Sequence, residues 1–265
     1  MYDLVRYAPV APLPVLEALR QENKLGNYLL LLAHDVVKYK KDYAELRAGP
    51  WKNTIIILDN SVVELGTAVS REMMVEAHEA VKPQFVVLPD VMHEAAATIE
   101  EHRKALAEWP RAWNYMAIPT GRSVAEALSV VEALQHVHGV RLWGIPKLLA
   151  EVINRGRFAE LVALMDTSSR QIHMLGFADN LLLEDLLSIQ ACARSLSRRI
   201  LGVDSAVPVR IGFAGQDLRN ALLEDNKIAS RGTFWADCEA FEGPLPKEVL
   251  RNMDYVRQLV NYGVM

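Results

Sequence analysis

The chain has 265 residues, of which 51% are hydrophobic, and this length suits one large α/β domain or two small ones with a sizeable core. Its net charge of −4 argues against extensive nonspecific binding of nucleic acid, although it is compatible with a local basic patch. The sequence lacks an apolar run of the roughly 20 residues that cross a bilayer, a signal-peptide pattern and the cysteines of a disulfide framework or zinc site, so we expect a cytoplasmic protein.

Short, β-rich apolar runs recur along the chain, and their starts lie about 24 to 31 residues apart, which fits one strand–helix unit each. Several are continuously apolar, as in IIIL and FVVL, which is typical of parallel strands covered on both faces. We predict eight strands, at Leu4–Val10, Tyr28–Ala33, Thr54–Leu58, Phe85–Leu88, Tyr115–Ile118, Arg141–Ile145, Ile172–Gly176 and Ile200–Val203.

Helix-start signals stand between the predicted strands. Ser70 can cap one helix, and Ser123 with Glu126 forms a capping box before an apolar face. Asp179 or Asn180 can cap another helix. Strands and helices therefore alternate along the chain.

This alternation predicts a (β/α)8 TIM barrel, with an open doubly wound sheet as the alternative. We expect a single domain over residues 1–265, with strand–helix repeats at 4–205 and a C-terminal helical extension at 206–265. The extension has helical stretches near Leu218–Leu223 and Pro246–Val260, and the Arg231–Pro244 region between them looks irregular.

Carboxylates follow three of the predicted strands, as Asp59, Asp90 and Asp204. The C-terminal strand ends of a barrel meet at one rim, so the three side chains are expected to converge, raise one another's pKa, and suit a nucleophile beside a general acid or base. Any one of them alone could be only a helix cap. Asp204 looks least like a cap because Pro208 disfavours a helix immediately after it.

Two other uses of the strand ends stay open. The carboxylates could hold a metal ion in a hydrolase or lyase, with His34, His93 or His173 as added ligands, although no HxH or HExxH spacing is present. Gly121-Arg122-Ser123 could bind an anion at a helix start, although a turn followed by the capping box explains the same residues.

An ordered series of segments over about residues 54 to 208 resembles the tRNA-guanine transglycosylases: LDNSVVELG, FVVLPD, MAIPTG, WGIPKLL, IHMLGF…LLLEDLL and GVDSAVP. The short chain and the Asp-Asn-Ser form are closest to the DpdA-like relatives, some of them phage-encoded, that insert 7-deazaguanines into DNA. The family's zinc ligands have no counterpart here, so neither a metal nor another cofactor is expected.

The resemblance implies a pentosyltransferase that exchanges guanine in DNA, or in tRNA, for a free 7-deazaguanine such as 7-cyano-7-deazaguanine through a covalent aspartyl-glycosyl intermediate. It implies Asp204 as nucleophile and Asp59 as acid or base, although Val207 stands where the family carries its nucleophile. It further implies substrate-binding and phosphate-binding residues, namely Asp90, Asn60, Thr120, Gly121, Pro146, Lys147 and Leu148 for the base and Arg122 and Arg210 for nucleic acid.

On this interpretation the target base must be flipped out or single-stranded. The enzyme would work in the cytoplasm, that of the host if it is phage-encoded. The alternatives are a metal-dependent TIM-barrel hydrolase or lyase that uses Asp59, Asp90, Asp204 and His34, and a noncatalytic nucleic-acid-binding relative.

Overall fold

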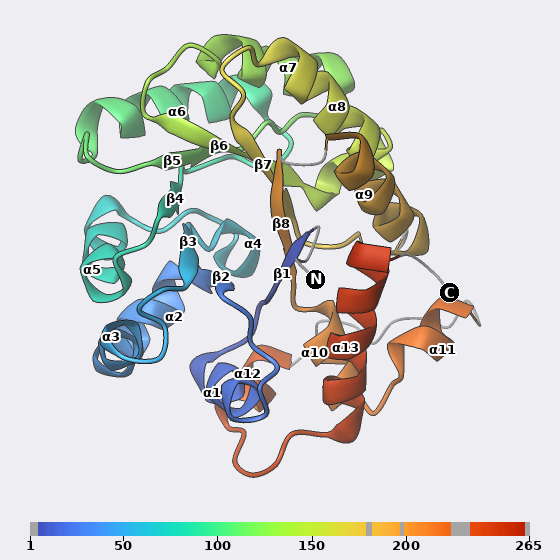
Figure 1. Cartoon of the computed structure of the whole chain (residues 1–265). Helices are drawn as coiled ribbons and strands as arrows, with labels where there is room; N and C mark the ends of the chain where they lie inside the picture. The colour runs from blue at the N-terminus through green and yellow to red at the C-terminus, as the bar shows by residue number, and fades with distance from the viewer. Residues whose placement is uncertain (1–4, 179–181, 197–198, 224–233, 263–265) are drawn as a thin grey trace.

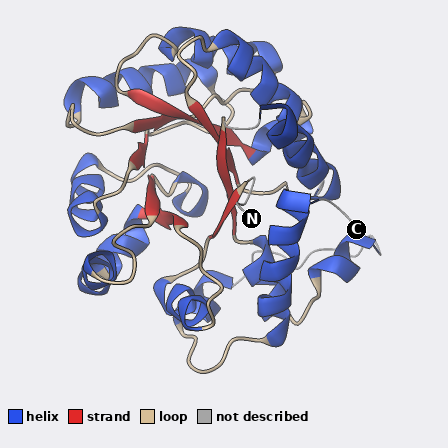
Figure 2. Ribbon diagram, viewed as in Figure 1, coloured by secondary structure: helices blue, strands red, loops and turns tan. Residues whose placement is uncertain are grey.

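The computed structural model describes residues 5–178, 182–196, 199–223 and 234–262. Eight parallel strands form one sheet in the order β1-β8-β7-β6-β5-β4-β3-β2, and helices surround it (Figures 1 and 2). The strands are β1 (Arg6–Pro9), β2 (Tyr28–Leu32), β3 (Ile55–Asp59), β4 (Phe85–Val87), β5 (Tyr115–Ala117), β6 (Val140–Pro146), β7 (Gln171–Leu175) and β8 (Ile200–Ser205). Strands β1 and β2 lie side by side but share no ladder among the described residues, so the barrel is nearly closed.

The strands alternate between two buried layers. In β2, Leu29 and Leu31 pack toward the helices, whereas Tyr28, Leu30 and Leu32 belong to a smaller cluster inside the barrel. A strand buried on both faces reads as a continuous apolar run, which is why the sequence predicted all eight strands to within a few residues. The (β/α)8 TIM barrel is confirmed.

The helices alternate with the strands. They are α1 (Leu13–Gln21), α2 (Ala33–Lys38), α3 (Lys40–Ala48), α4 (Val62–Leu65), α5 (Arg71–Val81), α6 (Ala95–Glu108), α7 (Val124–Leu134), the 3-10 helix η1 (Lys147–Glu151), α8 (Arg155–Met165) and α9 (Leu182–Leu196). As predicted, the Ser70 and Ser123 side chains accept hydrogen bonds from the N–H groups of Met73 and Glu126. Asp179 and Asn180, the predicted caps of α9, lie outside the described residues.

The C-terminal extension adds α10 (Val207–Phe213), α11 (Leu218–Leu223), α12 (Phe234–Glu239) and α13 (Lys247–Tyr262). Helix α13 packs against α10 and α9 (Figure 1). The Asn261 amide exchanges hydrogen bonds with the backbone of Val5, so the end of the extension is tied to the start of the chain.

Two expectations about this region were wrong. Helix α10 does begin immediately after β8, because Pro208 stands in its first turn, where the missing N–H has no partner to lose. The region predicted to be irregular contains α12. Asp204 is nevertheless not the cap of α10; that position belongs to Ala206.

Over the described residues, no helix combines the length and the apolar character that a bilayer crossing requires.

Candidate active site

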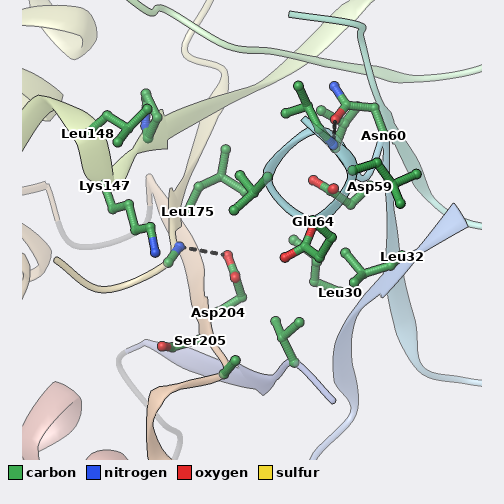
Figure 3. A pocket seen from close by; sticks show the side chains of 18 of the residues that line it. Leu30, Leu32, Asp59, Asn60, Glu64, Lys147, Leu148, Leu175, Asp204 and Ser205 are labelled. Atoms are coloured by element: carbon green, nitrogen blue, oxygen red, sulfur yellow. Dashed lines mark hydrogen bonds between the residues drawn. The ribbon is translucent and has the colours of Figure 1, made fainter. Parts of the chain in front are cut away.

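A pocket of about 640 Å³ opens at the C-terminal ends of the strands, where barrel enzymes carry their chemistry. Its walls are mainly apolar, with Leu30 and Leu32 from β2 among them, and polar groups enter from several strand ends (Figure 3). The polar and charged lining residues are His34, Asp59, Asn60, Glu64, Asp90, Thr120, Lys147, Asp204, Ser205 and Arg210. The barrel thus brings the three predicted carboxyl groups into one pocket.

Asp204, in β8, is held by one of its two carboxylate oxygens. Its Oδ1 accepts a hydrogen bond from the Gly176 N–H at 3.1 Å and lies 2.7 Å from the His173 Nε2. On the far side of the imidazole, the Tyr28 hydroxyl lies 2.5 Å from Nδ1. Both of these contacts are made to Oδ1, on the side of β7, and the Asp204 side chain lines the pocket.

The His173 and Tyr28 side chains lie inside the barrel beneath Asp204, and both are buried. Burial raises the pKa of the Tyr28 hydroxyl well above its usual value, and the negative charge of Asp204 adds to this, so the phenol stays protonated. The chain Tyr28–His173–Asp204 therefore fixes the carboxylate from below.

Asp59 ends β3 at another part of the wall, and its environment favours the protonated form. Burial is the main cause that raises its pKa well above the usual value, followed by the nearby charge of Glu64. The Ser61 N–H donates to Asp59 Oδ1 at 2.7 Å and opposes the shift, whereas the charges of Asp204 and Asp90 add to it. Figure 3 shows Asp59, Glu64 and Asp204 around the same space.

The backbone beyond β3 is bent sharply to place these groups. Ser61 has a left-handed conformation, with φ 62°, which is uncommon for a residue with a side chain and occurs often at functional sites. The Asn60 amide then bridges to the next strand: its Nδ2 donates to Leu88 O at 2.8 Å and to Asp90 Oδ1 at 2.9 Å, and its Oδ1 accepts from the Val62 N–H.

Asp90 follows β4 and is a second carboxyl group with an altered pKa. Burial raises its pKa to about 6, although the hydrogen bond from Asn60 partly opposes the shift. Two carboxyl groups with raised pKa values therefore stand on the β3–β4 side of the pocket.

Cationic side chains come from the opposite part of the barrel. Lys147 begins η1 after β6, and its side chain points toward Asp204 (Figure 3). Arg210, on α10, is buried and also lines the pocket. The pocket therefore has an acidic side with raised pKa values and a side where cations accompany Asp204.

Most of the predicted site residues meet in this pocket: Asp59, Asn60, Asp90, Thr120, Pro146, Lys147, Leu148, Asp204 and Arg210 all line it. Gly121 and Arg122 are not among the lining residues. A Cβ at Gly121 would come within 2.7 Å of the Glu126 Cβ, which explains the glycine by packing at the start of α7. Arg122 is exposed and pairs with Glu94.

Four residues that matter here escaped the sequence analysis as site residues: Tyr28, Glu64, His173 and Gly176. His173 had been considered only as a metal ligand. It alternates with apolar residues in β7, and a polar residue at an inward position of a barrel strand was the available signal. No sequence signal linked Tyr28 or Gly176 to Asp204.

Whether the pocket can bind a metal ion depends on which side chains could coordinate it. Over the described ranges, no three His, Cys, Asp or Glu side chains gather closely enough to hold one. His34 lines the pocket, but burial lowers its pKa and it does not join the carboxylates in such a cluster. The described residues therefore do not form a metal site of this kind.

Comparison with known proteins identifies the fold. No protein-family model and no curated protein sequence matches the chain. Among solved structures, it is similar to a mandelate racemase/muconate lactonizing enzyme from Roseiflexus sp., at TM-score 0.50 and 13% identity over 77% of this chain and 56% of that one. It is also similar to a D-psicose 3-epimerase from Clostridium cellulolyticum H10, solved with D-tagatose, at TM-score 0.50 and 12% identity over 96% and 98% of the two chains.

These similarities correct the functional expectation. The matching barrels are named as a racemase/lactonizing enzyme and an epimerase, so the interpretation as a transglycosylase-like pentosyltransferase with a DNA or tRNA partner and a 7-deazaguanine substrate is wrong. The segments that suggested it are strand ends with an aspartate, and any (β/α)8 enzyme places polar groups there. The alternative of a metal-dependent TIM-barrel hydrolase or lyase shares the fold of these neighbours, although the described residues provide no cluster of metal ligands.

Proposed function

We propose that this protein is a small-molecule enzyme that moves a proton at a carbon atom next to a carbonyl or carboxylate group, as an epimerase, racemase or lyase does. The observation that carries the proposal is the pairing of two unlike carboxyl groups in one apolar pocket. Asp204 is fixed by a backbone N–H and an imidazole, whereas burial favours the protonated form of Asp59. Groups with contrasting environments suit a base and an acid.

In this mechanism Asp204 Oδ2 accepts the proton from the substrate carbon. The electron pair of the broken C–H bond moves into the adjacent carbonyl group, and negative charge develops on its oxygen. The Lys147 ammonium group, with Arg210 nearby, stabilises that charge in a pocket whose walls are mainly apolar. Asp59 then donates its proton, either to the carbon, which gives the epimer, or to a leaving group, which gives elimination.

The apolar walls support a small organic substrate over a phosphodiester chain. Leucine, valine and aromatic side chains surround the carboxyl groups, and the volume of about 640 Å³ is that of a typical small-molecule site. The two matching structures are a mandelate racemase/muconate lactonizing enzyme and a D-psicose 3-epimerase, the latter solved with D-tagatose. At 12 and 13% identity they give the fold, and the proposal depends on the pocket.

Hydrogen–deuterium exchange at carbon tests the proposal. The protein is incubated in D₂O, with and without Mg²⁺, with a panel of ketoses, 2-hydroxy acids and 2-amino acids, and NMR follows the loss of each C–H signal. We expect exchange in at least one class. Asp204→Asn should slow it by about 10²- to 10⁴-fold, because the base is lost.

Asp217→Asn is the matched control, because Asp217 lies outside the pocket and caps a surface turn before α11. It should exchange at the unmodified rate. Absence of exchange across the whole panel, or an undiminished rate in Asp204→Asn, would overturn the proposal.

A further inference from the structure

Arg155 is the first residue of α8, and its guanidinium is completely buried behind the strand ends. Its Nε donates to Asp185 Oδ1 at 2.7 Å and its Nη2 to Asp185 Oδ2 at 2.5 Å. The remaining donors reach the backbone where β6 and β7 end. The three accepting carbonyls are those of Ile145 at 3.2 Å, Leu175 at 2.8 Å and Gly176 at 2.8 Å.

The last of these carbonyls belongs to the residue that holds Asp204. Gly176 donates its N–H to Asp204 Oδ1 while Arg155 binds its carbonyl oxygen. Its φ is +65°, and a Cβ at this position would lie 3.0 Å from the Lys147 Cδ, so the Lys147 side chain packs directly over it. One glycine therefore contacts both the Asp204 carboxylate and the aliphatic part of the Lys147 side chain.

The acidic partner of Arg155 fixes the other end of the same turn. Asp185 Oδ2 also accepts from the Ala178 N–H at 3.0 Å. The turn is thus held at residues 175, 176 and 178 by one buried ion pair whose members come from α8 and α9. A planar guanidinium with five fixed donors can satisfy this set of acceptors, whereas a lysine ammonium cannot.

We infer that Arg155 is a positioning residue for the active site: it holds the turn after β7 so that the Gly176 N–H orients Asp204 and the Gly176 backbone supports Lys147. The inference rests on the proposed role of Asp204 as a base. If the ion pair served stability alone, an apolar replacement of both partners would leave the Gly176–Asp204 hydrogen bond in place. If it positions the turn, that replacement would lose the hydrogen bond even in a folded protein.

The Gly176 N–H can be observed without a substrate. The sequence has four Leu–Gly pairs, which end at Gly26, Gly66, Gly176 and Gly202. Labelling leucine carbonyls with ¹³C and glycine nitrogens with ¹⁵N therefore isolates four amide signals, of which three are internal references. Asp204→Asn identifies the Gly176 signal, because it weakens the hydrogen bond that this amide donates to a charged acceptor.

Three variants are compared on this spectrum. Arg155→Lys keeps the charge, and the double variant Arg155→Met with Asp185→Leu removes both buried charges. Arg157→Lys is the matched control two residues along α8, where the exposed Arg157 pairs with Glu160. We expect the first two to move the Gly176 signal in the same direction as Asp204→Asn and to lower the C–H exchange kcat by about 10²-fold with little change in KM. Arg157→Lys should change neither.

The outcomes separate this inference from the proposed function. A Gly176 signal that stays in place in the folded double variant, or that fails to move in Asp204→Asn, overturns the positioning role and leaves the exchange assay to judge the function. A signal that moves while kcat does not change also overturns it. Should Arg155→Lys fail to fold, the double variant alone decides, since uncharged replacements of a buried pair are commonly tolerated.

Discussion

Gly176 offers the sharpest test at the scale of a single residue. A side chain there would be strained by φ +65° and would press on Lys147 at 3.0 Å. We expect Gly176→Ala to destabilise the fold by about 1–3 kcal/mol and to slow C–H exchange as well. Urea unfolding and the exchange assay measure the two effects.

Gly215→Ala is the control for backbone strain alone. Gly215 has φ +72°, but a Cβ there would meet nothing within 4 Å. It should lose similar stability and keep the unmodified exchange rate. Equal activity losses in the two variants would contradict a specific role for the Gly176–Lys147 contact.

At this same scale the sequence predicted the acidic residues of the pocket but not the residues that hold Asp204 in place. Asp59, Asp90 and Asp204 stand directly after apolar runs, so their convergence follows from the barrel alone. The histidine and the tyrosine beneath Asp204 come from β7 and β2, and only the curvature of the barrel brings them together. The pKa shifts were also beyond the sequence, because burial rather than mutual repulsion is the largest cause for both Asp59 and Asp90.

At the scale of elements, the close approach of α8 and α9 supports the position of Arg155. A Cβ on Gly156 would lie 2.3 Å from the backbone oxygen of Ser188, and the Gly156 N–H donates to the Ser188 hydroxyl at 2.7 Å. We expect Gly156→Ala to push the two helices apart, to destabilise the fold by about 1–3 kcal/mol, and to shift the Gly176 amide signal.

Gly26→Ala provides the comparison, because Gly26 precedes β2 and a Cβ there would meet nothing within 4 Å. Its unfolding free energy should change by less than about 1 kcal/mol. A Gly156→Ala protein as stable as the parent would show that the helices can separate at no cost.

Element boundaries were predictable where one physical signal dominated. Ser70 and Ser123 mark helix starts because a hydroxyl oxygen can accept from a free backbone N–H. The prediction that no helix begins directly after β8 was wrong because Pro208 has two opposite effects. A proline disfavours helical backbone in the residue before it, but it is favoured in the first turn of a helix. Helix α10 also packs against α13, which lies far away in the sequence, so this contact could not be predicted from the sequence around Pro208.

At the scale of the whole molecule, the order of strands and helices determined the fold class but not the reaction. The segments that resembled a transglycosylase occur in chain order at the places where every (β/α)8 barrel has strand ends. Their order therefore reflected the architecture. The chemistry depends on which side chains surround Asp204, and these come from distant parts of the chain.

The stability of the whole fold should also depend on pH through Asp35, a buried carboxyl group outside the pocket. Burial raises its pKa to about 6, although the Tyr43 hydroxyl donates to its Oδ2 at 2.5 Å and partly opposes the shift. Between about pH 4 and 6 the unfolded chain has already lost this proton while the folded chain keeps it. The contribution of Asp35 to the free energy of unfolding is therefore fully present below the pKa that Asp35 has in the unfolded chain. It is lost as the pH rises through about 6, the pKa of Asp35 in the folded chain.

We accordingly expect Asp35→Asn to remove this part of the pH dependence, because an amide cannot ionise. The difference in unfolding free energy between the variant and the parent should change by on the order of 2 kcal/mol between pH 4 and pH 7, in favour of the variant at the higher pH. Urea unfolding across this range measures it, with Asp42→Asn on the exposed face of α3 as the control. Parallel stability curves for the parent and Asp35→Asn would mean that Asp35 ionises equally easily in the folded and unfolded chains, and the buried Asp35–Tyr43 contact would then not account for any pH dependence of the fold.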